Sequence, residues 1–503
     1  MKPASMAIRR AIAALALAQL CLFATIGAAS AQPNPSSDTG LTAFVGVNVI
    51  PMDSERVLHD QTVLVRDKRI VSIGPASGAD IPETAQRIEG QGRWLMPGLA
   101  EMHGHVPGAD DLAYRENMLF LFVANGVTTI RNMAGDPSHI ALRKSIAAGE
   151  VVGPTLYTAS PWLDEGAASN ANEAGKVPAK YKAAGYDLIK IGSLPKKSYL
   201  AMAKAANRIG MPFGGHIPED VDLETALKER QKSIDHFDRY AEFLVPMEKR
   251  PKDLSRGFFG SGWIALADKG RIPLAVELTK EAGTWNMPTM SFIENMASAD
   301  DPQAMLESPE MRYMPRPVLE HWANGKRNHR NQADFQPNAA RRLMELRRKL
   351  LLALHRGGAL IALGSDAPQY FNVPGFSVHR EMLAMQQSGL TPYEVLVTAT
   401  RNPAAYFDAR EEFGTVSAGK RADLILLNAN PLDDIANAQK IEGVMLRGNW
   451  IDRSTIEQRL DEIAKDAAAP RFSLSRKQAV IVSAAALPVL AMGFFLFRRL
   501  RRG

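Results

Sequence analysis

Short apolar runs alternate with longer amphipathic stretches along the centre of the chain. Residues 99–410 contain eight runs with strand character, and stretches of helical periodicity such as residues 198–210 lie between them. This alternation is typical of a parallel α/β domain, and eight units predict a (β/α)8 TIM barrel. In such a barrel, chemistry gathers at the carboxyl ends of the strands. The eight runs read GLAEMHGH, VTTIRNMAG, TLYTASPW, YDLIKIGS, MPFGGHI, KSIDHFD, WNMPTMSF and ALIALGSDAP.

Strand-rich segments flank this centre on both sides. Residues 41–98 and residues 411–455 each contain short strand-like runs that polar turns separate. We expect these two segments to form one small β-sandwich domain, built from both ends of the barrel region. Residues 456–478 are expected to form an amphipathic stem helix and a linker.

Both ends of the chain have the features of targeting segments. Residues 1–31 combine cations, an apolar run and an Ala-Ser-Ala site, which predicts a signal peptide cleaved before Gln32. Residues 479–497 carry no charge and approach the length of a transmembrane helix, and residues 498–503 form a basic cytoplasmic tail. We therefore expect a single-pass protein of the cell inner membrane, with its main domain in the periplasm. A tail that is removed by processing remains an alternative.

Charge and cysteine content narrow the chemistry. Much of the net charge of +6 comes from the signal and tail segments, so the rest is close to neutral and gives no reason to expect a nucleic-acid partner. The one cysteine, Cys21, lies in the signal segment. A mature chain without cysteine has no disulfides and no thiolate ligands, which leaves histidine and carboxylate chemistry.

Histidines and one aspartate stand at the ends of several predicted strands. His103 and His105 end the first strand two residues apart, so both imidazoles face the same side of it. His216 ends the fifth strand, His236 the sixth and Asp366 the eighth. Each residue alone could have an ordinary structural role. Together they predict a divalent metal site, because several histidines with one carboxylate suit zinc and related ions.

Lys190 lies in the apolar fourth strand, where burial of an ammonium group is costly. The side chain could extend to the rim of the barrel and keep its charge in water. If it points into the barrel mouth instead, neighbouring metal ions would favour the neutral amine. A neutral lysine amine can add carbon dioxide, and the resulting carbamate has two oxygens that can bridge two metals.

The ordered set of candidate ligands resembles the amidohydrolase superfamily, in its imidazolonepropionase-like and Xaa-Pro dipeptidase (prolidase)-like branch. The motifs that carry the resemblance are LMPGLAEMHGH, IKIG, GGHI, SIDHF, LGSDAP and RNPAAYF followed by FGTVSAGKRADLILLNANPL, within residues 41–455. Glu101 departs from the pattern, because the family usually has an aspartate two residues before the first histidine.

The resemblance implies a role for each candidate ligand. His103, His105 and Asp366 would hold one metal, while His216 and His236 would hold a second. Carboxylated Lys190 would bridge the two ions, with a hydroxide as the other bridge. Two Zn²⁺ ions are the expected cofactors, with a carbamate derived from CO2 on the lysine. Asp366 would also act as the catalytic general acid and base.

Further polar residues are candidates for substrate contacts or for support of the ligands. Asn132 follows the second strand, and Thr289 and Ser291 lie in the seventh. Basic and aromatic residues of an inserted stretch, residues 300–335, could form either a lid over the barrel mouth or an ordinary solvated face. His379 opens a helix after the last strand and is expected to play a supporting or structural role. The lid candidates are Arg312, Tyr313 and His321.

The sequence thus predicts a metal-dependent amidohydrolase that cleaves an amide or peptide C–N bond, with dipeptides among the candidate substrates. One alternative is a mononuclear imidazolone-type cyclic amidase or deaminase, which would not need Lys190. Another is a non-catalytic binding protein on the same fold. The expected partners are a small-molecule or dipeptide substrate and the membrane, and a homo-oligomer remains open.

Overall fold

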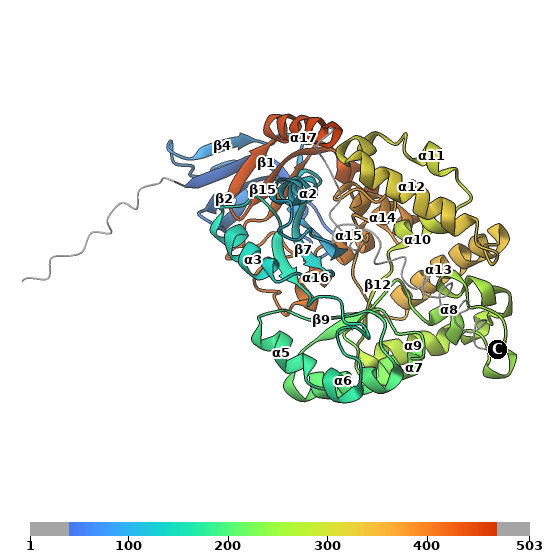
Figure 1. Cartoon of the computed structure of the whole chain (residues 1–503). Helices are drawn as coiled ribbons and strands as arrows, with labels where there is room; N and C mark the ends of the chain where they lie inside the picture. Colours follow the sequence, from blue (N-terminus) through green and yellow to red (C-terminus); the bar gives the residue numbers. More distant parts are fainter. Residues whose placement is uncertain (1–39, 470–503) are drawn as a thin grey trace, which may run out of the picture.

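The computed structural model describes residues 40–469 of the chain. Figure 1 shows a body rich in helices, with a twisted sheet at one side. The sheet has the strand order β16-β15-β14-β5-β1-β2-β3, and β4 pairs with β1. Its strands are β1 (Leu41–Val49), β2 (Leu58–Arg66), β3 (Arg69–Pro75), β4 (Gln86–Glu89), β5 (Trp94–Pro97), β14 (Leu424–Leu427), β15 (Ile441–Leu446) and β16 (Asn449–Asp452).

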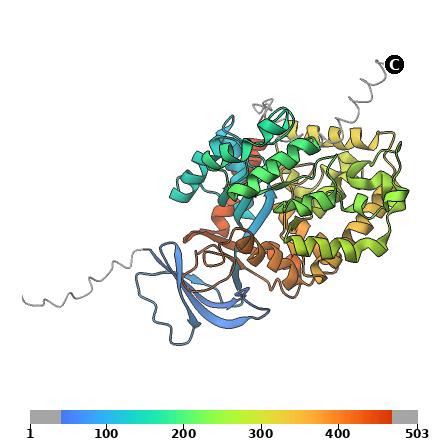
Figure 2. The same cartoon turned by 90° about the horizontal axis from the view of Figure 1, so that it is seen from below.

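Strands from the two ends of the described chain meet within this sheet. β5 pairs antiparallel with β14, so a segment that precedes the barrel bonds to one that follows it. Apolar side chains alternate with more exposed ones along β2, and the buried set packs with β1, β5 and β14 into a core of its own. Figure 2 shows the N-terminal strands of this sheet beside the helix-rich body.

Eight parallel strands of the described chain form two further sheets, in the orders β6-β7-β8 and β13-β12-β11-β10-β9. Bridges close both seams between them, from Ala159 to Leu188 and from Gly104 to Ala367. The carboxyl ends of these strands therefore surround one space. The strands are β6 (Leu99–Gly104), β7 (Val127–Asn132), β8 (Thr155–Thr158), β9 (Ile189–Ile191), β10 (Phe213–Gly215), β11 (Ser233–Asp235), β12 (Trp285–Met287) and β13 (Leu360–Ile361).

Helices follow the barrel strands and cover them. In α6 the buried residues Tyr199, Met202, Ala203 and Ala206 recur at helical spacing, and Gly210 ends the helix with a φ of 63°. The helices are α2 (Leu112–Ala124), α3 (Ser138–Ala148), α4 (Ala171–Ala174), α5 (Val177–Ala183), α6 (Lys196–Ile209), α7 (Leu223–Lys228), α8 (Tyr240–Phe243), α9 (Ile272–Ala282), α10 (Met290–Ala297), α11 (Pro302–Met305), α12 (Arg316–Arg330), α13 (Pro337–Arg356), α14 (Phe376–Gln387), α15 (Pro392–Ala399), α16 (Arg401–Tyr406) and α17 (Arg453–Ala468).

The prediction of a C-terminal transmembrane helix is corrected by the structure. Within residues 40–469, no helix combines the length and the apolar character that crossing a bilayer requires. The predicted location as a single-pass inner-membrane protein is contradicted by the same finding. The segments on which these predictions rested, residues 1–31 and 479–503, lie outside the described residues. The last described helix, α17, packs Ile456, Leu460 and Ile463 against the body of the protein.

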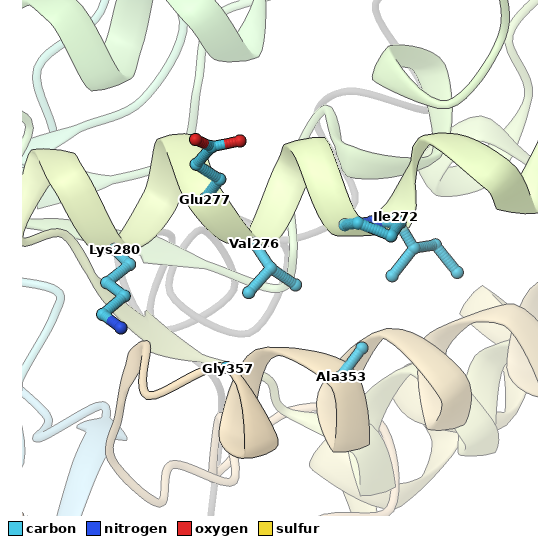
Figure 3. Close-up of a pocket in the computed structure, with 7 residues that line it drawn as sticks. Ile272, Val276, Glu277, Lys280, Ala353 and Gly357 are labelled. Atoms are coloured by element: carbon cyan, nitrogen blue, oxygen red, sulfur yellow. The ribbon is translucent and has the colours of Figure 1, made fainter.

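Of two cavities in the described structure, one lies on the outer helical layer and the other lies at the barrel mouth. A groove of about 430 Å³ lies between α9 and α13, and Figure 3 shows Val276, Ala353 and Gly357 among its lining residues. It is on the outer helical layer and contains none of the predicted ligands. A smaller cavity of about 170 Å³ lies between the segments that follow β10 and β11, and Arg239 and Arg256 help to line it. The second cavity is at the end of the barrel where chemistry is expected.

Candidate active site

The first three predicted ligands meet at the carboxyl end of β6. His105 Nε2 lies 2.6 Å and His103 Nε2 lies 3.4 Å from Oδ1 of Asp366. One ligand atom from each residue falls within 4.8 Å of the others, and all three side chains are buried. A backbone hydrogen bond holds these residues together. The N–H of Asp366 donates to the carbonyl of His103 across the seam between the first and last barrel strands.

Two further imidazoles extend this cluster. The ring centroid of His236 lies 4.6 Å from that of His103 and 4.8 Å from that of His216. His236 has a φ of 62°, and Arg347 donates a 2.6 Å hydrogen bond to its carbonyl. The structure therefore brings all four predicted histidines together with Asp366, although the tightest group contains only His103 and His105.

Lys190 lies inside the barrel and is fully buried. Within residues 40–469, its Nζ has no hydrogen-bond partner and lies 5.2 Å from the ring centroid of Trp162. Burial lowers the pKa of the lysine, although Asp235 and Asp366 act in the opposite direction. A Cβ on Gly215 would lie 2.7 Å from Cδ of Lys190, so the absence of a side chain there makes room for the lysine stem.

A buried carboxylate that the sequence interpretation missed orients His103. Oδ2 of Asp235, in β11, lies 2.8 Å from Nδ1 of His103. The Arg131 guanidinium donates to both oxygens of Asp235, at 3.0 and 3.1 Å, and all three side chains are buried. Burial alone would raise the pKa of Asp235, but Arg131 holds that pKa well below its usual range. A proton on Nδ1 beside this anion leaves the Nε2 lone pair of His103 for a metal.

The other two histidines of the cluster have comparable partners. Nδ1 of His216 lies 2.9 Å from Oδ2 of Asp238, and Nδ1 of His236 lies 2.8 Å from the hydroxyl of Thr289. Thr289 was a candidate for such support, whereas Asp238 was not identified from the sequence. Both contacts leave Nε2 of the imidazole as the available ligand atom.

Glu101 connects the two strands that carry the tightest ligand group. Its carboxylate accepts from the backbone N–H of His103 at 2.8 Å and from the backbone N–H of Ser365 at 2.9 Å. The Ser365 hydroxyl also donates to it. Burial raises the pKa of Glu101 to about 8. The residue that departs from the family pattern thus fixes the backbone on both sides of the site without reaching the ligand atoms.

Three of the remaining candidates, Asn132, Ser291 and His379, have hydrogen-bond partners among the protein groups around the cluster. Asn132 accepts a hydrogen bond from the N–H of Val106 and donates to Thr158, so it braces the segment after His105. The N–H of Ser291 donates to Glu381. Nε2 of His379 lies 3.1 Å from the carbonyl of Asn125, which indicates a structural contact.

The lid candidates do not gather over the metal ligands. Arg312 and Tyr313 lie in a short 3-10 helix, Pro309–Tyr313, that packs against α17. The Tyr313 ring stacks on Phe376 with centroids 5.2 Å apart. The ring centroid of His321, in α12, lies 6.3 Å from that of Tyr370, in the segment that follows Asp366.

The chemistry of the cluster fits divalent metal ions. Among the described residues, Oδ2 of Asp366 and Nζ of Lys190 are buried and have no hydrogen-bond partner. Buried polar atoms without partners are costly, and a metal ion would satisfy them. Burial, with the nearby Lys190, lowers the pKa of His103 to about 4. Burial also lowers the pKa of His236, so these imidazoles are neutral near pH 7, as metal ligands must be.

Comparisons with known proteins agree with this chemistry. The model of the amidohydrolase family matches residues 94–451. Ochratoxinase from Aspergillus niger is 25% identical over 446 residues, which cover 79% of this chain and 83% of that protein. An imidazolonepropionase from Bradyrhizobium sp. is 24% identical over 389 residues, covering 74% and 88% of the two chains.

Solved structures share the fold. A Xaa-Pro dipeptidase with methionine bound in its active site superposes with a TM-score of 0.60 at 19% identity. The superposition covers 82% of this chain and 100% of the dipeptidase. At this level of identity, the similarity establishes the architecture alone.

Proposed function

The chain belongs to the amidohydrolase family and is a metal-dependent hydrolase of carbon–nitrogen bonds, and we propose that its site binds two divalent ions. Family membership confirms both the resemblance seen in the motifs and the predicted enzyme class. In this proposal, His103, His105 and Asp366 hold one ion. His216 and His236 hold the other, and a carbamate on Lys190 bridges the pair. Zinc is the ion that this donor set favours.

The observation that carries the two-ion proposal is the state of Lys190. The side chain lies inside the barrel rather than at its rim, and its Nζ has no hydrogen-bond partner within residues 40–469. Burial without a partner favours the neutral amine, which is the form that adds carbon dioxide. A one-ion deaminase or cyclic amidase would have no use for this lysine.

Bound divalent ions supply a nucleophile at neutral pH and polarise a substrate carbonyl. Among the protein groups, Asp366 is placed to move the proton. Its Oδ1 contacts His105, whereas its Oδ2 has no hydrogen-bond partner among the described residues. Burial acts to raise the pKa of Asp366, but His103 and His105 hold it below the ordinary value, so the group starts as a base. It would accept a proton during attack and deliver it to the leaving amine.

The proposed substrates are small amides, with dipeptides of the Xaa-Pro type as the first candidates. The Xaa-Pro dipeptidase with the same fold supports this choice. The name of the Aspergillus relative, ochratoxinase, extends the candidates to amides that are not peptides. Arg312 gives no support for a lid that recognises a substrate carboxylate, because it donates to Tyr313 beside α17.

Metal content and a Lys190→Ala variant test the proposal. The purified full chain should bind close to two equivalents of zinc and hydrolyse members of a dipeptide and N-acyl amino-acid library. Lys190→Ala should bind less metal and lose activity by about a hundredfold or more, since even residues that only support metal ligands cost 10- to 100-fold. Short carboxylic acids should restore part of this activity.

Lys326→Ala is the matched control. Lys326 is also fully buried, but its Nζ donates to the hydroxyl of Ser298 and to the backbone carbonyl of Asn295 in α10. This control should lose stability and keep its metal content. Full activity and two bound ions in Lys190→Ala would contradict the bridging carbamate. Close to one equivalent in the unmodified protein would favour the mononuclear alternative, and close to none a binding protein.

A further inference from the structure

Three aromatic side chains stand beside the imidazoles of the second proposed metal site. The ring centroids of Phe259 and Phe292 lie 5.7 and 5.9 Å from that of His236. The ring centroid of Trp162 lies 5.3 Å from that of His216. The three rings come from the segments that follow β8, β11 and β12, so three barrel strands lead to planar apolar side chains beside the same pair of imidazoles.

Phe259 is held in an unfavourable backbone conformation. It has φ 48° and ψ 40°, a region that bulky residues rarely adopt. Gly257 and Gly260 on either side also have positive φ, at 65° and 85°. Phe258 fixes the turn by packing on His329, with ring centroids 4.7 Å apart. Backbone strain of this kind is concentrated at functional sites, so the strained turn indicates that the position of the Phe259 ring matters.

Trp162 reaches the site because a glycine directly follows β9, the strand that carries Lys190. A Cβ on Gly192 would lie only 1.7 Å from Nε1 of Trp162. The indole thus lies directly against the backbone just after Lys190, and its face is 5.2 Å from the lysine Nζ. Any larger residue at position 192 would displace the indole from both Lys190 and His216.

The three rings are not simply core filling. Trp162 and Phe259 remain partly exposed, although both lie beside buried candidate ligands. Phe292 is buried and stands between His236 and Tyr370, whose ring centroid is 6.3 Å away. Partly exposed aromatic faces beside reactive groups are suited to bind a planar apolar group by stacked or edge-to-face contact.

From this arrangement, we propose that the enzyme prefers amides that carry an aromatic ring next to the scissile bond. The inference rests on the proposed function, since it places the ring beside the second metal site. Trp162 and Phe259 would contact the two faces or edges of the ring, and Phe292 would close the inner end. An aliphatic substituent would bury less apolar area and would have no ring contacts.

Two matched substrate pairs test this preference with the zinc-loaded full chain. N-acetylphenylalanine is compared with N-acetylalanine for a ring on the amine side. N-benzoylglycine is compared with N-acetylglycine for a ring on the acyl side. In at least one pair, we expect kcat/KM to be roughly tenfold or more higher for the aromatic member, since each ring contact contributes about three- to tenfold.

Variants at the strained turn test which residues are responsible. Phe259→Ala should reduce the aromatic-to-aliphatic ratio of kcat/KM about three- to tenfold, and Phe259→Tyr should retain most of it. Trp450→Ala is the control, because that ring packs on Phe44 in the sheet formed by the two ends of the described chain and should leave the ratio unchanged. The ratio is insensitive to a loss of folded protein, which affects both substrates equally.

The outcomes separate the preference from the function on which it rests. Turnover with ratios near one in both pairs would overturn the aromatic preference and leave the amidohydrolase proposal intact. An unchanged ratio in Phe259→Ala would overturn the role of the turn. No hydrolysis of these four substrates, or of the wider amide library, by the zinc-loaded protein would overturn the proposed function and this inference with it.

Discussion

Replacement of Asp235 by asparagine should weaken the site in two separable ways. The native carboxylate contacts Nδ1 of His103 on one side and the Arg131 guanidinium on the other. Asparagine keeps the shape but loses the charge and has only one accepting oxygen. If Arg131 donates its hydrogen bonds to that oxygen, the NH2 group of the substituted asparagine faces His103. The imidazole proton then moves to Nε2, the atom that should bind the metal.

The stability cost follows from the buried charge pair. Nη2 of Arg131 lies 3.0 Å from Oδ1 of Asp235, and neither side chain is exposed. At an effective dielectric constant of about 20, unit charges at this separation attract by about 5 kcal/mol. Measured losses on removing one member of a buried pair are about 3–5 kcal/mol. We expect Asp235→Asn to lower the free energy of unfolding by this amount and metal affinity by about 10- to 100-fold.

A double variant separates the two effects. Asp235→Asn with Arg131→Met removes both charges, so part of the lost stability should return. Metal affinity should stay low, because His103 still lacks its carboxylate. Urea unfolding of the metal-free protein and competition for zinc with a chromophoric chelator measure the two quantities.

An exposed ion pair provides the control for this experiment. Glu294 and Arg348 form a contact of 2.9 Å, with side chains 43% and 36% exposed. Glu294→Gln should cost less than about 1 kcal/mol and should leave zinc binding unchanged. Native zinc affinity in Asp235→Asn, alongside the expected loss of stability, would refute the role assigned to Asp235 in orienting His103.

Two further predictions concern groups around the cluster. Burial raises the pKa of Glu381 from an ordinary 4.5 to about 7, so its contribution to stability is complete below pH 4.5 and is lost as the pH rises through 7. Glu381→Gln should flatten that decline in urea unfolding, and an unchanged slope would contradict it. Gly192→Ala should displace Trp162, with a shift in tryptophan fluorescence and reduced activity. Gly74→Ala, where a Cβ meets nothing within 4 Å, should leave both unchanged.

The ligands that could be predicted from the sequence share one property, which is that each stands at the end of a predicted barrel strand. Strand ends are visible as the point where an apolar run becomes polar, and His216 in GGHI is an example. Asp235 also stands at the end of its strand, beside His236, but this position alone does not show which group its carboxylate contacts. Its role depends on contact with His103 and Arg131, which lie in β6 and β7 and are far away in sequence. Such contacts follow from closure of the barrel and not from local pattern.

The contacts of the inserted stretch, residues 300–335, also could not be predicted from local pattern. Its basic and aromatic residues made a lid one candidate, but composition does not determine which neighbour a segment packs against. Arg312 and Tyr313 lie in a 3-10 helix that packs against α17, which comes from the C-terminal end of the described chain. The aromatic residues beside the ligands come from other loops, and Phe259 depends on a strained turn that hydrophobic pattern does not reveal.

The buried lysine connects several sequence features that otherwise appear unrelated. Gly215 leaves space for the Lys190 stem, and Gly192 admits the Trp162 indole beside the amine. The indole face and the carboxylates of Asp235 and Asp366 would all stabilise an ammonium group. Burial opposes the charge more strongly, so the pKa of Lys190 falls despite these neighbours. The site therefore shifts Lys190 toward the neutral amine and surrounds it with groups suited to cations, which is the direction that carbamate formation and a bridging role between two metal ions require.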